Sequence, residues 1–199
     1  MSKISEALPG RVIMTDDPMR ARMLSAHHLE YSTLIYESGD ILVYSGSYNG
    51  VPIALVSTGF GSGAVLSYLR ELKAHGVKEI IYIGACVSTS ARHGLRSVIL
   101  SDGGGKSLLG RAYVAAKHCE ISISTQVVMP KDGTQSGKTG IIDGVTGALY
   151  EQAKADGIEV LSVLTVSENT ATGEILDDHE RRSRFYAASR LVFEIFGIA

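Results

Sequence analysis

The chain has 199 residues, of which 45% are hydrophobic and 20% charged. This composition is typical of a globular domain and excludes fibrous and disordered classes. Nineteen basic and 21 acidic residues give a formal charge of −2, so the chain lacks the basic excess of proteins that bind nucleic acid or anionic membranes. It has no run of 18 apolar residues and no apolar leader, so we expect a cytoplasmic protein without a membrane span. The length fits one domain over 1–199.

Cysteine and histidine give no sign of a metal site or a disulfide framework. Cys86 and Cys119 are the two cysteines, too few for either a disulfide framework or a cysteine-only metal site. None of the six histidines pairs with a carboxylate or a cysteine at a recognised metal-ligand spacing. We therefore predict no metal.

Strand-like and helix-like segments alternate along the chain. Strands are predicted at 11–15, 41–48, 52–58, 79–84, 97–100, 120–125 and 160–166, and helices at 19–29, 64–75, 108–118, 146–155 and 175–196. Asp17 before Pro18 fits a helix N-cap, and Asn49-Gly50 predicts a hairpin turn. The alternation favours an α/β fold with a mixed, largely parallel sheet and one antiparallel hairpin.

Four polar or glycine-rich segments follow predicted strands, at 16–17, 59–63, 84–88 and 167–169. Ligands of such sheets bind at the carboxyl ends of the strands, so we expect a site there. The glycine-rich segment precedes a helix, where backbone amides bind anions; a tight packing turn is an equally good interpretation. Glu168 follows a buried strand, and its carboxyl group suits proton transfer to a bound heterocycle. A strand-end turn or helix N-cap region is the structural alternative.

Two segments approach the phosphate-binding P-loop pattern. Gly105-Lys106-Ser107 and Gly137-Lys138-Thr139 supply its second half, but Leu100 and Asp132 stand where the first glycine is required. Without that glycine the backbone does not form the phosphate cradle. We therefore do not expect a nucleoside triphosphatase.

Several segments in order resemble the nucleoside phosphorylase and uridine phosphorylase family. They are Asp17-Pro-Met-Arg-Ala21, Tyr44-Ser-Gly-Ser-Tyr-Asn-Gly50, Ser57-Thr-Gly-Phe-Gly61, Gly76 to Cys86, Gly94 to Ile99, Ala148-Leu-Tyr150 and Leu164-Thr-Val-Ser167. The likeness runs from about residue 9 to the C-terminus. The chain is shorter than family members between about 104 and 139, a region that helps build their base pocket.

The resemblance implies a three-layer α/β/α sandwich and an enzyme of nucleoside salvage. Family members cleave the N-glycosidic bond of a purine or pyrimidine nucleoside and transfer the pentosyl group to phosphate. Phosphate is then a co-substrate, and no cofactor is expected. The oxocarbenium-like transition state needs an anion below the sugar and a proton donor beside the base. Members assemble as homo-oligomers, so we expect one here.

On the phosphate side, the resemblance implies that Arg20 binds the anion, together with the backbone of Gly59 and Gly61. Asp16 stands where the family has the glycine whose amide meets phosphate. Ala85 replaces a phosphate-binding serine or threonine, and Tyr82 replaces an arginine. A phosphate dianion beside Asp16 is less well bound than in the family.

On the nucleoside side, Phe60 takes the place of the methionine under the sugar, and Asp143 is a substitute for the family's sugar-binding carboxylate. Cys86 matches the family residue on the base side. Ser167 and Glu168 occupy the end of the family's Thr-Val-Ser-Asp motif, so Glu168 is the predicted acid.

Three functions remain open from the residues. The first is a divergent phosphorylase with Glu168 as proton donor. The second is a hydrolase in which Asp16 or Asp17 activates water. The third is a non-catalytic relative that binds a small ligand with a degenerate phosphate site.

Overall fold

A computed structural model describes residues 4, 6–129, 140–183 and 185–198. Its strands are β1 (Arg11–Thr15), β2 (Glu30–Ser38), β3 (Ile41–Tyr48), β4 (Val51–Ser57), β5 (Glu79–Ser88), β6 (Val98–Ser101), β7 (Ile123–Gln126), β8 (Val128–Met129), β9 (Ile141–Ile142), β10 (Glu159–Asn169) and β11 (Glu174–Ile175). Its helices are α1 (Pro18–His28), α2 (Ser62–Ala74), α3 (Lys106–His118), α4 (Thr146–Asp156), α5 (Asp178–Ser183) and α6 (Tyr186–Gly197).

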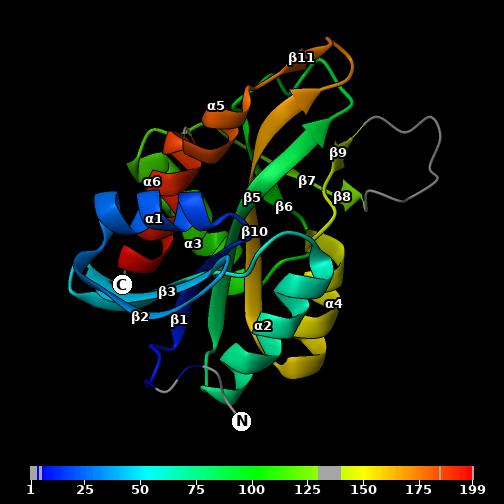
Figure 1. Cartoon of the computed structure of the whole chain (residues 1–199). Helices are drawn as coiled ribbons and strands as arrows, with labels where there is room; N and C mark the ends of the chain where they lie inside the picture. The colour runs from blue at the N-terminus through cyan, green and yellow to red at the C-terminus, as the bar shows by residue number, and fades with distance from the viewer. Residues whose placement is uncertain (1–3, 5, 130–139, 184, 199) are drawn as a thin grey trace.

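One mixed sheet forms the middle layer, in the order β2-β3-β4-β1-β5-β10-β6-β7. The central strands β4, β1, β5 and β10 are parallel, whereas β2, β3 and β4 form an antiparallel meander at one edge. Helices α1, α3 and α6 cover one face and α2 and α4 the other (Figure 1). The predicted three-layer α/β/α fold is confirmed.

Alternating side chains of the central strands fill two separate cores. Ile13 of β1 packs with α1, α3 and α6, while its neighbours Val12 and Met14 pack with α2 and α4. This alternation follows from the period of two in a strand. Because both faces of the central strands are buried, functional side chains are confined to the strand ends and the loops that follow them.

Local signals in the sequence predicted two turns correctly. The Asp17 carboxylate accepts hydrogen bonds from the amides of Met19 and Arg20 at 2.8 and 3.4 Å, as an N-cap. Asn49 and Gly50 have positive φ angles of 50° and 75° and join β3 to β4. These two turns fix the start of α1 and the register of the hairpin.

The predicted helix at 175–196 is wrong at its start. Glu174 and Ile175 pair with β10, and the amide of Leu176 donates to the carbonyl of Ser167. The chain turns helical only after Asp177, whose carboxylate accepts from the amide of Glu180 at 2.7 Å. A break at Phe185, with ψ of 46°, then separates α5 from α6. Tertiary pairing with β10 therefore overrides the helical periodicity of this segment.

Several strands were missed or misjudged in length, and the short strands β8, β9 and β11 were not predicted. β2 was not predicted, because most of its residues are exposed and show no buried alternation. β5 and β10 continue beyond the predicted ends at 84 and 166, to Ser88 and Asn169. The predicted strand at 120–125 begins at Ile123. In the part of the chain that the structure describes, no helix is long and apolar enough to cross a membrane.

Candidate functional site

A cavity of about 160 Å³ lies at the carboxyl ends of β1, β4 and β5. Its lining residues are Asp16, Asp17, Arg20, Phe60, Ala85, Asp178 and Arg181. Three of the four segments singled out in the sequence therefore meet there. Asp16, Arg20, Phe60 and Ala85 are the predicted site residues that the structure brings together.

Arg20 is the central cation of this cavity, and it is only 5% exposed. Its NH1 group donates to Thr15 Oγ1 at 2.9 Å and to Asp16 Oδ1 at 3.1 Å, and its NH2 group donates to the carbonyl of Arg181 at 2.9 Å. The guanidinium carbon lies 4.6 Å from the ring centre of Phe185. These contacts fix the guanidinium plane. Among the described residues, its buried Nε has no hydrogen-bond partner.

Asp16 supplies a carboxylate beside that cation. Burial raises the pKa of Asp16 above its ordinary value of 3.8, although the charge of Arg20 acts in the opposite direction. Burial, with the carboxylates of Asp16 and Asp143 nearby, also raises the pKa of Tyr82 well above its ordinary value. The residue that replaces a family arginine is thus a neutral hydroxyl, and Arg20 is shared between Asp16 and any incoming anion.

The loop between β4 and α2 carries Gly59, Phe60 and Gly61. Gly59 and Gly61 have φ angles of 78° and 93°, a backbone conformation that favours glycine. The amide of Thr58 donates to the carbonyl of Thr15 at 3.0 Å, so this loop leaves the sheet beside Asp16. The Phe60 side chain is 62% exposed, which leaves an aromatic ring at the mouth of the cavity.

Cys86 does not line the cavity. Ala85 faces α1, α3 and α6, whereas Cys86 lies in the core against α2 and α4. Burial raises the pKa of the Cys86 thiol far above its ordinary value, with Asp143 adding to the effect. The Ser167 hydroxyl donates to the Cys86 carbonyl at 3.3 Å. Cys86 and Ser167 are therefore buried near the candidate site but do not line it.

Glu168 does not line the cavity, but a β-bulge places it on the same side of the sheet. The register of β10 against β5 shifts between Val166 and Glu168, so Glu168 pairs with Val87 instead of Ser88. Paired residues of parallel strands point to the same face, and residues two apart on a strand share a face. Glu168 therefore projects from the same face as Ala85, roughly 7 Å further along the strands. Bulges re-aim side chains in this way next to active sites.

Asp143 has a structural contact that the sequence did not suggest. Its Oδ2 accepts hydrogen bonds from the amides of Val145 and Thr146 at 3.2 and 2.7 Å. These bonds close the turn that leads into α4, whose N-cap residue is Val145, and Asp143 is 8% exposed. Arg181 and Asp178 of α5, by contrast, line the cavity and were missed. They were missed because a single helix was predicted at 175–196, whereas a loop and the short helix α5 place Asp178 and Arg181 at the cavity.

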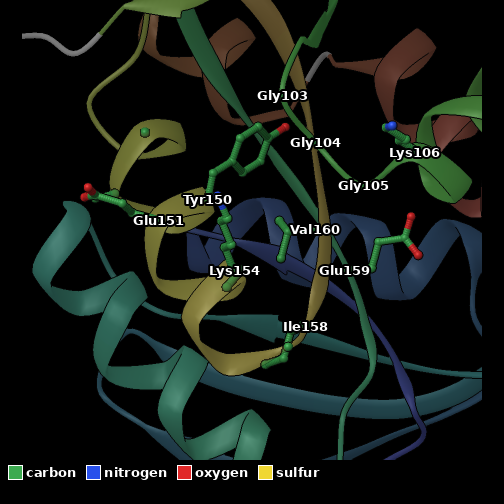
Figure 2. Close-up of a pocket in the computed structure, with 14 residues that line it drawn as sticks. Gly103, Gly104, Gly105, Lys106, Tyr150, Glu151, Lys154, Ile158, Glu159 and Val160 are labelled. Carbon is green, nitrogen blue, oxygen red and sulfur yellow. The ribbon is translucent and has the colours of Figure 1, made fainter.

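A larger hollow of about 900 Å³ lies at the opposite edge of the sheet, where β10 begins (Figure 2). Gly103, Gly104, Gly105 and Lys106 form one wall of it, with Tyr150 of α4 beside this glycine loop. The Glu159 carboxylate accepts from the amides of Ser107 and Leu108 at 2.8 and 2.9 Å. The anion position at the start of α3 is therefore taken by the protein itself, which agrees with rejecting a P-loop. The second P-loop-like segment, at 137–139, lies outside the described residues.

The protein is an α/β sandwich with charged residues at the carboxyl edge of its sheet, where proteins of this architecture bind small ligands. No protein-family model matches the chain. It is 31% identical over 216 aligned positions to a purine nucleoside phosphorylase DeoD-type from Shewanella oneidensis, with 92% of each chain covered. It is 26% identical to one from Myxococcus xanthus, covering 92% of this chain and 90% of the relative. The chain belongs to the nucleoside phosphorylase family.

The fold comparison agrees. A crystal structure of purine nucleoside phosphorylase from Toxoplasma gondii in complex with immucillin-H superposes with a TM-score of 0.84 at 16% identity, over 96% of this chain and 91% of that one. This likeness supports the three-layer fold.

Proposed function

We propose that this protein cleaves the N-glycosidic bond of a nucleoside and transfers the pentosyl group to phosphate. The observation that carries the proposal is the cavity at the strand ends. It combines Arg20 and Arg181 with the ring of Phe60 and lies on the Glu168 side of the sheet. The relatives are named purine nucleoside phosphorylases, which favours a purine nucleoside over a pyrimidine one.

Arg20 is the anion-binding residue in this proposal. Its Nε is a buried donor without a partner among the described residues, and a phosphate oxygen supplies the missing acceptor. Gly59 and Gly61 flank Phe60 in the chain, and Phe60 lines the same cavity. An anion held there lies below the sugar, where positive charge develops as the bond to the base breaks.

Glu168 is the proposed acid that assists departure of the base. The bulge in β10 directs its side chain to the cavity face, and a carboxyl group within hydrogen-bond reach of a ring nitrogen transfers a proton as the bond breaks. Phe60 packs on the sugar in this assignment, whereas Cys86, Ser167 and Asp143, which the resemblance also implies as site residues, do not line the cavity. This assignment needs no cofactor, only phosphate as co-substrate.

A hydrolase is the second candidate, because Asp16 already occupies one edge of Arg20 at 3.1 Å. A buried carboxylate with a raised pKa is suited to act as a general base towards water. In this version Asp16 takes a proton from water, the water oxygen bonds to C1′ as the bond from C1′ to the base breaks, and the base leaves with a proton from Glu168, which gives a free base and a free pentose.

Release of free base from inosine, adenosine and uridine, followed by absorbance with and without phosphate, separates the candidates. Release that requires phosphate supports phosphorolysis, and equal release without phosphate supports the hydrolase. Absence of release across the panel, with saturable nucleoside binding by calorimetry, supports the non-catalytic relative.

We also propose that the protein is a cytoplasmic homo-oligomer of nucleoside salvage. The edge strand β2 and its surroundings expose Tyr31 at 92% and Leu34 at 39%, and β11 exposes Ile175 at 61%. Apolar surface of this kind on an edge strand is typical of a subunit interface. Light scattering at micromolar concentration tests this, and a monomer contradicts it.

A further inference from the structure

A second group of reactive side chains lies where α3 ends against α6. His118 is the last residue of α3, Cys119 is its C-cap, and Glu194 belongs to α6. The two helices cover the same face of the sheet (Figure 1). His118 and Cys119 lie 76 and 75 positions before Glu194 in the chain. The sequence, from which we predicted no metal, therefore gave no sign of this group.

The donor atoms of these residues converge. One nitrogen of His118, the Sγ of Cys119 and one carboxylate oxygen of Glu194 all lie within 4.8 Å of one another. His118 Nδ1 lies 2.5 Å from Glu194 Oε1. Cys119 is a free thiol, 6% exposed, and Glu194 is 8% exposed. The His118 side chain is 70% exposed, so the cluster opens to solvent on one side.

The other carboxylate oxygen of Glu194 is held in place. The Tyr48 hydroxyl, at the end of β3, donates to Glu194 Oε2 at 2.9 Å. Carboxylate ligands of metal ions characteristically carry such a hydrogen bond on their second oxygen. Glu194 thus has one oxygen fixed by the protein and the other directed at His118 and Cys119.

We propose that His118, Cys119 and Glu194 form a zinc-binding site of this protein. A nitrogen, a thiolate sulfur and a carboxylate oxygen are the three ligand types that Zn²⁺ prefers, whereas Mg²⁺ and Ca²⁺ select oxygen alone. Zinc–ligand distances are about 2.0 Å to nitrogen and oxygen and about 2.3 Å to sulfur. Binding requires the exposed His118 side chain to reorient so that all three ligand atoms reach one ion, and a water molecule would complete the four-coordinate shell.

Two neighbouring groups set the conditions for binding. Burial raises the pKa of Cys119, the positive charge of Arg190 opposes that rise, and Glu194 adds to it. Zinc must therefore displace the thiol proton, as it does at other thiolate sites. The bound ion would join the end of α3 to α6 and, through Tyr48, to β3. None of the three ligands lines the Asp16–Arg20 cavity, so the site is independent of the proposed function.

Tag-free protein, stripped with chelator and titrated with Zn²⁺ by calorimetry, tests the proposal. We expect one Zn²⁺ per chain and a Tm increase of roughly 5–10 °C at 100 times the Kd. Replacing Zn²⁺ with Co²⁺ should give the near-ultraviolet charge-transfer band of a thiolate ligand. Cys119→Ser should abolish that band. His118→Ala, at an exposed position, and Tyr48→Phe should each weaken binding by about tenfold or more.

Two matched variants serve as controls. Cys86→Ser removes the other cysteine and His27→Ala removes an exposed histidine, and both should leave stoichiometry, affinity and the Co²⁺ band unchanged. Absence of the band, or binding that Cys119→Ser and His118→Ala leave intact, overturns the proposal. Binding that His27→Ala weakens as much as His118→Ala is adventitious surface binding and overturns it as well.

Discussion

The carboxylate of Asp16 lies 3.1 Å from the guanidinium of Arg20, one helical turn away at the start of α1. In the proposed reaction the same guanidinium binds the phosphate ion. An internal carboxylate and the substrate anion then compete for one residue. The first prediction follows from that competition.

Asp16→Asn should separate the two proposed reactions. Under phosphorolysis, loss of the negative charge lowers the KM for phosphate about tenfold or more, because a like charge at about 4 Å is removed from a buried site. Under hydrolysis the same variant loses its base and its rate falls by about 10² or more. Steady-state kinetics with varied phosphate distinguishes these results.

Arg20→Met should reduce kcat/KM for phosphate by about 10²–10³, because the variant keeps the volume of the side chain and loses its charge-assisted hydrogen bonds. Arg22→Met is the matched control. Arg22 lies on the same helix in an exposed ion pair with Glu37 at 2.8 Å, and its loss should leave the kinetics unchanged. Equal effects of the two substitutions would contradict the role of Arg20.

The pH dependence of stability should report the buried Asp16. Because its pKa is raised in the folded protein, the folded state favours the protonated carboxyl. The stabilisation is fully present below 3.8 and is lost as the pH rises through the folded pKa. Asp16→Asn mimics the protonated form, so its free energy of unfolding should exceed that of the parent increasingly above pH 3.8. Urea unfolding at several pH values measures this difference.

Asp156 supplies a control of opposite sign. A hydrogen bond from Lys73 lowers the pKa of Asp156 below 3.8. Its contribution is therefore present above pH 3.8 and is lost as the pH falls through the folded pKa. Asp156→Asn should be destabilised at neutral pH and match the parent in acid. If both asparagine variants shift the curve in the same direction, the electrostatic interpretation of Asp16 is wrong.

Glu168→Gln should lower kcat by about 10²–10⁴ and leave Tm unchanged, because the amide keeps the shape of the side chain and loses the transferable proton. Glu174→Gln, on the neighbouring strand β11, serves as control and should retain the parent rate. If the Glu168→Gln variant keeps the parent kcat, Glu168 is not the proton donor.

Two substitutions distinguish a structural role of Asp143, which bonds the amides before α4, from a role in binding the sugar. Asparagine retains N-cap ability, whereas alanine does not, so Asp143→Ala should cost about 0.5–2 kcal/mol of stability and Asp143→Asn much less. A sugar ligand requires the carboxylate, and Asp143→Asn should then raise the nucleoside KM. If Asp143→Asn is stable and its nucleoside KM is unchanged, Asp143 has only the structural role before α4.

The alternation of strand and helix patterns predicted the α/β class and the largely parallel sheet, because both depend on local periodicity, while the three-layer arrangement came from the family resemblance. The sequence also predicted the Asp17 cap and the Asn49–Gly50 turn, whose chemistry is contained in two or three neighbouring residues. The start of the predicted helix at 175–196 was wrong, because residues 174–175 pair with β10, and local periodicity does not reveal such a long-range contact. β2 was missed because an exposed edge strand has no buried face to produce a pattern.

The candidate site was predicted in part for the same reason. The segments that contain Asp16, Phe60 and Ala85 follow strands whose ends meet at one edge, as the topology implies, and the family resemblance added Arg20. The direction of the Glu168 side chain depends on a bulge in β10, and the residues around it gave no signal that predicts a bulge. Arg181 reaches the cavity on a helix that the sequence placed inside a longer one. Tertiary contacts decided both cases.

Phosphorus NMR of the reaction products tests the central claim most directly. Protein incubated with inosine and inorganic phosphate should convert the phosphate signal into that of a pentose 1-phosphate, in amounts equal to the base released. Arg20→Met should suppress the new signal. Release of base without any sugar phosphate, or no change in either signal, would contradict phosphorolysis at this site.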